Sequence, residues 1–226
     1  MEAIRVIARI RNAYESKFGV PRQSGLAETV ISDIVFEPEY RAPEALRGLE
    51  EFSHLWLIWG FDRNGRETWK PTVRPPRLGG NQRVGVFATR SPFRPNPIGL
   101  SCVRLCGVEK TAEGTVLKVA GADLVNGTPI YDIKPYLPYA DCVPGASGGF
   151  TDRTEKRRVL VELPDSLRQG TPAELLAGLE AVLAEDPRPA YQEDPERIYA
   201  FEFGGYHVAF QVRNGILRVT ELQGKR

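Results

Sequence analysis

The stretch Ser53-His54-Leu55-Trp56-Leu57-Ile58-Trp59-Gly60-Phe61 decides the fold class of this 226-residue chain. It is apolar at successive positions, without alternation, and therefore predicts a central strand that is buried on both faces. Short apolar runs separated by turn residues surround it, and the chain holds 22 glycines and 18 prolines. Such punctuation is typical of a β-rich fold with many turns. A mainly β fold is expected.

Further strands are predicted on both sides of this run. Inside residues 98–108 the apolar positions change parity after Cys102, and a β-bulge near Cys102 or Val103 would explain the change. The other predicted elements are strands at residues 4–10, 84–87, 115–120 and 129–133, and a short helix start at residues 43–50.

The C-terminal part predicts one long helix followed by a meander. Residues 171–185 begin Thr-Pro-Ala-Glu, which suits an N-cap Thr171 with proline in the first helical position. The dipeptides Gly204-Gly205 and Asn214-Gly215 favour tight hairpins between three strands. The glycine-rich residues 144–149 suggest a boundary near residue 150, so domains are expected at residues 1–150 and 151–226.

Composition excludes several classes of protein. Thirty basic and 29 acidic residues give a net charge of +1, and no window approaches the ~20 apolar residues of a membrane span. Residues 1–10 enter a strand pattern without a signal-peptide core. The three cysteines and two histidines lack metal-ligand spacing. We expect a cytoplasmic protein with no metal site and no membrane contact.

The charge is unevenly distributed along the chain. Residues 171–202 are rich in acids, whereas residues 62–94 carry eight basic residues against Asp62 and Glu67. The basic stretch predicts an anion-binding region, with a solvated loop that happens to carry arginines as the alternative. Its basic residues are Arg63, Arg66, Lys70, Arg74, Arg77, Arg83, Arg90 and Arg94.

The most informative motif is Ala-Thr-Arg-Ser-Pro-Phe-Arg-Pro-Asn-Pro-Ile-Gly-Leu-Ser at residues 88–101. Its three prolines fix φ and restrict the residues before them, so helix and central strand are both excluded. The prediction is a stiff loop that presents two guanidiniums, a hydroxyl and an amide, and ends in Gly99. Such preorganisation lowers the entropy lost on ligand binding. The alternative is a proline-rich connector.

A second motif covers residues 121–139 and contains an acid and a base two positions apart. Asn126-Gly127 predicts a turn, and the strand after it places Asp132 and Lys134 on one face. The pair runs into Pro-Tyr-Leu-Pro-Tyr, a rigid segment with stackable rings. The alternative is a surface ion pair that contributes ~1 kcal/mol at most.

Motifs for nucleotide binding and nucleophilic catalysis are missing from the sequence. No Gly-x-Gly-x-x-Gly follows a strand, no Walker loop occurs and no βαβ alternation is found, which argues against a Rossmann fold. Neither histidine lies in a nucleophile triad. In its apolar strand His54 is expected to be a hydrogen-bonded core residue, and Trp56 and Trp59 to be core.

These segments together resemble the TrmO (YaeB/TsaA-like) family of S-adenosylmethionine-dependent tRNA methyltransferases, which act on threonylcarbamoyl-adenosine beside the anticodon. The resemblance implies an antiparallel β-barrel methyltransferase of non-Rossmann type over residues 1–150. It also implies a homodimer and a small α+β C-terminal domain over residues 151–226. The match rests on residues 88–101, 126–139, 52–57 and 21–26, and on Asp-Pro-Arg-Pro-Ala-Tyr at 186–191.

Methyl transfer to the exocyclic N6 of the base at position 37 of tRNA would need a donor site and a base. Asp132 is expected to be the base and Lys134 an electrostatic aid. The ring of Phe93 or Tyr136 could face the sulfonium, and such a cation–π interaction typically contributes ~0.5–2 kcal/mol. Contacts with S-adenosylmethionine are expected from Arg90, Ser91, Pro92, Phe93, Arg94, Asn96, Gly99, Leu100 and Tyr136, and contacts with tRNA from Arg63, Arg66, Arg188 and Tyr191.

Two other functions remain open at the level of sequence. One is a barrel that binds a modified nucleoside or tRNA without chemistry, and binding of S-adenosylmethionine would separate the two. The other is a methyltransferase with a different acceptor. Thiol chemistry is a distant third, because Cys102 and Cys106 lie in an apolar strand without a nearby histidine.

Overall fold

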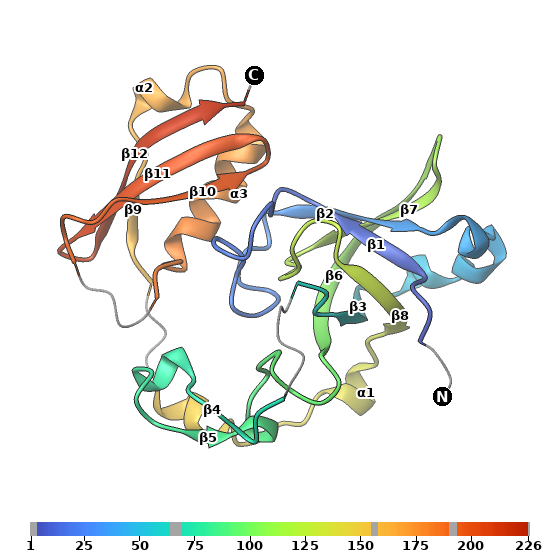
Figure 1. Ribbon diagram of the computed structural model, residues 1–226. Helices are drawn as coiled ribbons and strands as arrows, with labels where there is room; N and C mark the ends of the chain where they lie inside the picture. The colour runs from blue at the N-terminus through green and yellow to red at the C-terminus, as the bar shows by residue number, and fades with distance from the viewer. Residues whose placement is uncertain (1–3, 64–68, 155–157, 190–193, 226) are drawn as a thin grey trace.

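The computed structural model describes residues 4–63, 69–154, 158–189 and 194–225. Figure 1 shows a larger sheet built from the N-terminal half, a smaller sheet from the C-terminal third, and a short hairpin that lies apart from both. The expectation of a mainly β fold with antiparallel sheets is confirmed.

The larger sheet has the strand order β1-β2-β7-β6-β3-β8 and closes into a barrel, because β8 pairs again with β1. All neighbouring pairs are antiparallel. Every second side chain along these strands points into the barrel, where one cluster of buried apolar residues fills the interior. The strands are β1 (Ala8–Arg11), β2 (Ile31–Phe36), β3 (His54–Gly60), β6 (Ile98–Thr111), β7 (Gly114–Ala120) and β8 (Pro129–Pro135).

Strand β3 is buried on one face only, so the expectation of burial on both faces was wrong. Leu55, Leu57 and Trp59 point into the core, whereas His54 and Trp56 on the outer face are partly exposed. The reason is that the closed sheet covers only its inner face. Trp59 is thus a core residue as expected, and Trp56 and His54 are not, although the His54 ring lies 2.9 Å from the Ser53 hydroxyl.

Strand β6 contains a bulge, but not where the parity change predicted it. Its pairing with β3 is regular from Ile98 to Arg104, and the register shift occurs against β7 between Leu105 and Gly107. The apolar residues Ile98 and Leu100 lie on the outer face, where they are 36% and 49% exposed. The parity change therefore marks an apolar outer surface.

The smaller sheet contains the predicted meander of β10 (Tyr199–Phe203), β11 (Tyr206–Arg213) and β12 (Ile216–Gly224). Strand β9 (Leu160–Glu162), which was not predicted, adds to β12 in parallel. The predicted helix is α3 (Ala173–Ala184); Pro172 occupies its N-cap, so the assignment of Thr171 to that position was one residue early.

The remaining elements are short. The described residues contain no helix that is both long and apolar enough to cross a membrane. The predicted strand at residues 84–87 stops after two residues and turns into a 3-10 helix, and the predicted helix start at 43–50 forms two 3-10 turns. These elements are β4 (Thr72–Val73), β5 (Val84–Gly85), α1 (Pro138–Asp141), α2 (Asp165–Arg168), and the 3-10 helices Pro38–Tyr40, Pro43–Leu46, Leu49–Glu51, Pro76–Leu78, Val86–Ala88 and Gly149–Arg153.

Candidate functional site

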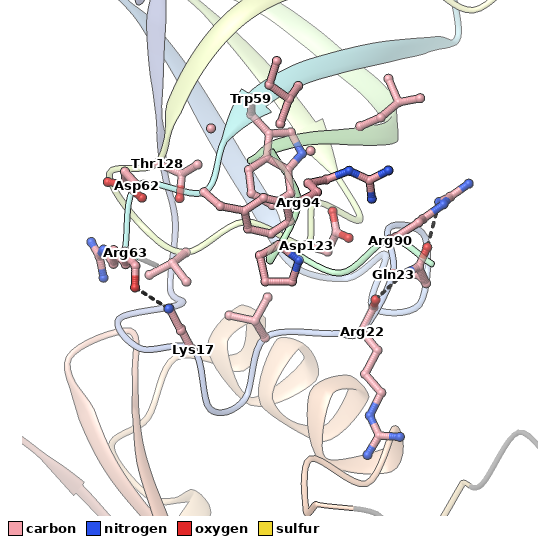
Figure 2. Close-up of a pocket in the computed structure, with 18 of the residues that line it drawn as sticks. Lys17, Arg22, Gln23, Trp59, Asp62, Arg63, Arg90, Arg94, Asp123 and Thr128 are labelled. Carbon is pink, nitrogen blue, oxygen red and sulfur yellow. Dashed lines mark hydrogen bonds between the residues drawn. The ribbon is translucent and has the colours of Figure 1, made fainter. Parts of the chain in front are cut away.

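A cavity of ≈ 530 Å³ lies beside the strand ends at one side of the barrel (Figure 2). Its walls come from residues 17–23, from the end of β3 with residues 61–63, from the loop at residues 89–97 that leads into β6, and from residues 123–128. The proline-braced motif and the start of the second motif therefore meet at one site.

The polar floor of this cavity is a chain of three side chains. The Trp59 indole Nε1–H donates to Ser101 Oγ at 2.9 Å, and the Ser101 hydroxyl donates to Asp123 Oδ1 at 2.5 Å. Ser101 is fully buried, and Figure 2 shows the Asp123 carboxylate below Trp59 with Arg94 and Arg90 to one side. The carboxylate is thus held in a fixed orientation inside the cavity.

Burial raises the pKa of Asp123 above its ordinary value. Four interactions oppose this shift: hydrogen bonds from the Ser101 hydroxyl and from the backbone N–H groups of Asp123 and Ser24, and the positive charge of Arg90. A carboxyl group with a raised pKa that points into a cavity is a candidate for binding a cationic or hydrogen-bond-donating ligand group. The motif at residues 121–139 contains this aspartate, but its sequence context alone indicates no role for it.

The loop at residues 89–97 is braced by its own side chains as well as by its prolines. Thr89 Oγ1 donates to Val86 O and accepts from the Ser91 N–H, and Ser91 Oγ accepts from the Phe93 N–H. Arg94 donates to Thr89 O at 2.9 Å, so its guanidinium also supports the loop. These short-range bonds replace the ladder bonds that proline cannot make.

Gly99 is needed for packing at the cavity wall. It pairs with Trp59 across β3 and β6, and a Cβ at Gly99 would overlap the Trp59 indole. The group that lies closest to Gly99 is therefore the Trp59 side chain of the same chain. Any larger residue would displace Trp59 and, with it, the hydrogen bond to Ser101.

The predicted cofactor contacts divide into three groups. Ser91 and Phe93 line a neighbouring groove, and Arg90 reaches Gln23 Oε1 at 2.7 Å. Tyr136 lies on the outer face of the barrel, where its ring packs near those of His54 and Trp56. The residues that line the cavity are Arg90, Pro92, Arg94, Asn96, Gly99 and Leu100.

Asp132 and Lys134 do not line this cavity. They form an ion pair of 2.8 Å on the outer face of β8, opposite Ile58 and Trp56 of β3. Their side chains are 47% and 61% exposed. Within one chain the pair has the geometry of the surface ion pair that the sequence left open as an alternative.

Two of the predicted tRNA-binding arginines are held by partners in the chain. Arg63 lines the cavity and donates to the carbonyls of Asn126 and Glu15. Arg188 binds both oxygens of the Asp186 carboxylate at 2.8 Å. The other two residues predicted to contact tRNA, Arg66 and Tyr191, lie outside the described residues.

The described residues contain no group of three or more His, Cys, Asp or Glu side chains that could hold a metal ion. Cys102 is partly buried, and burial raises the pKa of its thiol, which disfavours the nucleophilic thiolate. The candidate site is therefore the cavity with its carboxylate, its arginines and its aromatic wall.

Comparisons with known proteins assign this chain to a family of tRNA methyltransferases. The family model described as "tRNA-methyltransferase O N-terminal domain" matches residues 9–142, and the one described as "TrmO C-terminal domain" matches residues 159–225. The chain belongs to the TrmO family, as the resemblance of its motifs indicated.

The similarity to individual proteins extends over nearly the whole chain. A tRNA (adenine(37)-N6)-methyltransferase of Escherichia coli is 42% identical, covering 96% of each chain. A putative S-adenosylmethionine-dependent methyltransferase of Pseudomonas aeruginosa is 41% identical, covering 98% of each. The crystal structure of TrmO from Pseudomonas aeruginosa superposes with a TM-score of 0.81 at 33% identity, covering 99% of each chain.

Proposed function

We propose that this protein transfers the methyl group of S-adenosylmethionine to the exocyclic N6 of threonylcarbamoyl-adenosine at position 37 of tRNA. The observation that carries the proposal is the meeting of the proline-braced loop and the buried Asp123 at one cavity in a chain of the TrmO family. The names of the similar proteins from Escherichia coli and Pseudomonas aeruginosa support both the donor and the acceptor.

The residues of the cavity fit the donor. S-adenosylmethionine carries a cationic ammonium and sulfonium, a carboxylate and an adenine. Asp123 offers an acceptor for the cationic end, and Arg90 a cation for the carboxylate. The rings of Trp59 and Phe61, with centroids 4.2 Å apart, form an apolar wall for the flat or sulfonium parts. The bound donor would supply an electrophilic methyl group, and alignment is the main demand on the protein.

The acceptor nitrogen lies between a purine and a carbonyl, so its proton is relatively acidic and a base would assist transfer. We assign this role to Asp132, with Lys134 stabilising the resulting negative charge. Asp132→Asn is expected to lower the rate roughly 10²–10⁴-fold with donor affinity unchanged. Full turnover by Asp132→Asn at unchanged donor affinity would remove Asp132 from the mechanism.

A homodimer would account for the distance between this pair and the cavity of the same chain. The outer face of β3 and β6 carries partly exposed apolar residues, among them Trp56, Ile58 and Leu100, and it continues to the cavity rim at Leu100. A second copy seated there would cover this surface and bring its own Asp132–Lys134 pair to the cavity. Light scattering should give twice the mass of one chain; a monomer at micromolar concentration would argue against it.

The proposed domain organisation follows the two sheets. Residues 1–150 would form the donor-binding methyltransferase domain, and residues 151–226 a small C-terminal domain. A tRNA substrate and reduced cysteines are consistent with a cytoplasmic location.

The direct test is mass spectrometry of nucleosides from tRNA that carries the threonylcarbamoyl mark, after incubation with the protein and S-adenosylmethionine. We expect a mass gain of one methyl group on threonylcarbamoyl-adenosine. A gain on another nucleoside would keep the enzyme class and change the acceptor. Donor binding without any methylated product would favour a binding protein.

A further inference from the structure

We propose that a groove next to the cavity binds the single-stranded RNA flanking the target base. Phe87, which lines the groove, and Trp69, whose ring stacks on that of Phe87, form a platform on which a base stacks. The inference rests on the proposed function and adds a binding site to it. The groove measures ≈ 1350 Å³ and lies between residues 17–23, the β4–β5 hairpin and the residues that follow α3. These three parts surround the centre of the view in Figure 1.

The groove and the cavity share a wall. The two spaces adjoin, because they share the lining residues Pro21, Arg22, Gln23, Thr89 and Arg90. A base that enters the cavity would leave its neighbouring nucleotides in the groove. An RNA loop with one base turned out of the stack has this shape.

Positive charge in the groove exceeds negative charge. The two acids that line it are each bound to an arginine: Glu185 to Arg158 at 3.1 Å and Asp186 to Arg188 at 2.8 Å. In the described part of the chain no carboxylate lies within 4 Å of the Lys70 or Arg74 head group. These two cations therefore remain available for phosphates. The basic residues that line the groove are Lys17, Arg22, Lys70, Arg74, Arg83, Arg90 and Arg188.

The aromatic pair is unusually exposed for its size. Trp69 is 49% and Phe87 is 72% exposed, and their rings stack with centroids 6.3 Å apart and planes 26° apart. The Arg94 guanidinium lies 6.0 Å from the Phe87 ring centre. Large aromatic rings beside cations are the arrangement with which proteins hold single-stranded bases. An apolar protein partner would not need the surrounding lysine and arginines.

The backbone holds this platform in place. The Val86 N–H donates to Pro71 O at 2.9 Å, and β4 pairs with β5 directly beside it. Phe87 lies in the 3-10 helix Val86–Ala88, whose C-terminal end is fixed by the bond from the Thr89 hydroxyl to Val86 O. The platform is thus attached to the loop that lines the cavity, and a stacked base would register the RNA against that loop.

The test measures the affinity of an anticodon stem-loop RNA for the full chain by fluorescence anisotropy, without the methyl donor. The double substitution Trp69→Ala and Phe87→Ala is expected to weaken binding roughly ten- to hundredfold. Trp69→Phe, which keeps a ring, should bind nearly as wild type. Leu160→Ala is the matched control, because Leu160 is 73% exposed on the smaller sheet. Wild-type affinity in the double variant would overturn the proposal.

Charge is tested separately by the salt dependence of the same affinity. Lys70→Ala and Arg74→Ala should each reduce the slope of log affinity against log salt by about 0.7. Arg218→Ala, on the exposed face of β12, should leave it unchanged. Equal slopes for all three variants would contradict phosphate contacts in the groove.

Four further measurements separate this inference from its alternatives: donor affinity, thermal unfolding, methylation of tRNA and molecular mass. Donor affinity and thermal unfolding should match wild type in every variant, which shows that the variants fold and keep the cavity.

If the wild type binds RNA through the platform but methylates none, the proposed function fails and the groove stands. If the wild type methylates tRNA and the double variant binds RNA equally well, the groove fails alone. A change of mass from dimer to monomer in the double variant would show that a second copy covers the rings, and would also overturn the proposal.

Discussion

The Asp123 carboxylate is the group in the cavity on which burial, hydrogen bonds and a neighbouring positive charge all act. Its carboxylate accepts hydrogen bonds from Ser101 and the Ser24 backbone and faces the charge of Arg90. On another side lies Tyr14, whose pKa is raised by burial and by the Asp123 charge. A carboxylate in these surroundings is ionised at a cost, which a cationic ligand group would offset.

This cost predicts how stability depends on pH. Burial raises the pKa of Asp123 in the folded protein above the ~3.9 of an unfolded aspartate. Between these two values folding takes up a proton, so the contribution of Asp123 to the free energy of unfolding falls as pH rises. Asp123→Asn removes that contribution, and its stability relative to wild type should improve from pH 4 to pH 7. Urea unfolding at a series of pH values measures this, and a constant difference would contradict the raised pKa.

Individual residues of the site could be predicted from sequence only where the motif itself dictates the geometry. Three prolines and two hydroxyl residues define the loop locally. Of the loop residues that line the cavity, Arg90, Pro92, Arg94 and Asn96 were among the predicted donor contacts, whereas Thr89 was not. Asp123 was missed because its significance depends on Ser101, 22 residues earlier, which the barrel brings into contact. Arg63 and Arg188 looked available in the sequence, but their partners are fixed by the tertiary fold.

At the scale of elements, the pairing of β3 with β6 shapes the cavity wall. Gly99 stands opposite Trp59 with no room for a Cβ, whereas Gly107 of the same strand has open space. Neither glycine has a positive φ, so the difference between them is steric.

Gly99→Ala is therefore expected to destabilise the protein by about 1–3 kcal/mol and to weaken donor binding, because the Trp59 indole must move. Gly107→Ala should change the free energy of unfolding little. Urea unfolding and calorimetric titration with S-adenosylmethionine measure both variants. Equal effects of the two substitutions would show that packing against Trp59 does not hold the cavity wall.

The elements that the sequence predicted well are those with local signals. The meander follows from two turn dipeptides, in which Gly204, Gly205, Asn214 and Gly215 all take positive φ. The parallel pairing of β9 with β12 joins segments more than 50 residues apart, and nothing local encodes it. The predicted position of the bulge in β6 was wrong. Apolar residues on the outer face, Ile98 and Leu100, give the sequence the same change of parity that a bulge would give.

The whole molecule is joined by the segment at residues 13–30. Tyr14, Ala27 and Val30 belong to the core cluster of the smaller sheet, and Tyr14 bridges to Phe203 of β10. The backbone also crosses, since the Gly204 N–H donates to Ala13 O at 2.9 Å. The core of the smaller sheet is thus completed by the N-terminal part of the chain.

This shared core predicts that both sheets unfold together. Phe203 is 1% exposed, and Phe203→Ala is expected to cost about 3–5 kcal/mol. All three tryptophans precede residue 70, so tryptophan fluorescence reports the N-terminal part. Phe203→Ala should nevertheless shift the fluorescence transition in urea to lower concentration. An unshifted transition would mean that the two sheets unfold independently.

The composition of the sequence suggested a boundary near residue 150. It did not suggest that residues 13–30 would supply part of the core of the smaller sheet. Glycine-rich linkers are visible in composition, whereas contacts between distant segments arise only when the chain is folded. Residues 13–30 carry short irregular stretches with no helical or strand period, so no pattern pointed to the smaller sheet.

The most direct test of the central claim is a crystal structure of the protein soaked with S-adenosylmethionine. The donor should occupy the cavity between the loop at residues 89–97, Trp59 and Asp123, with its cationic end toward the Asp123 carboxylate. Clear density for the donor at any other place on the molecule, with this cavity empty, would contradict the account.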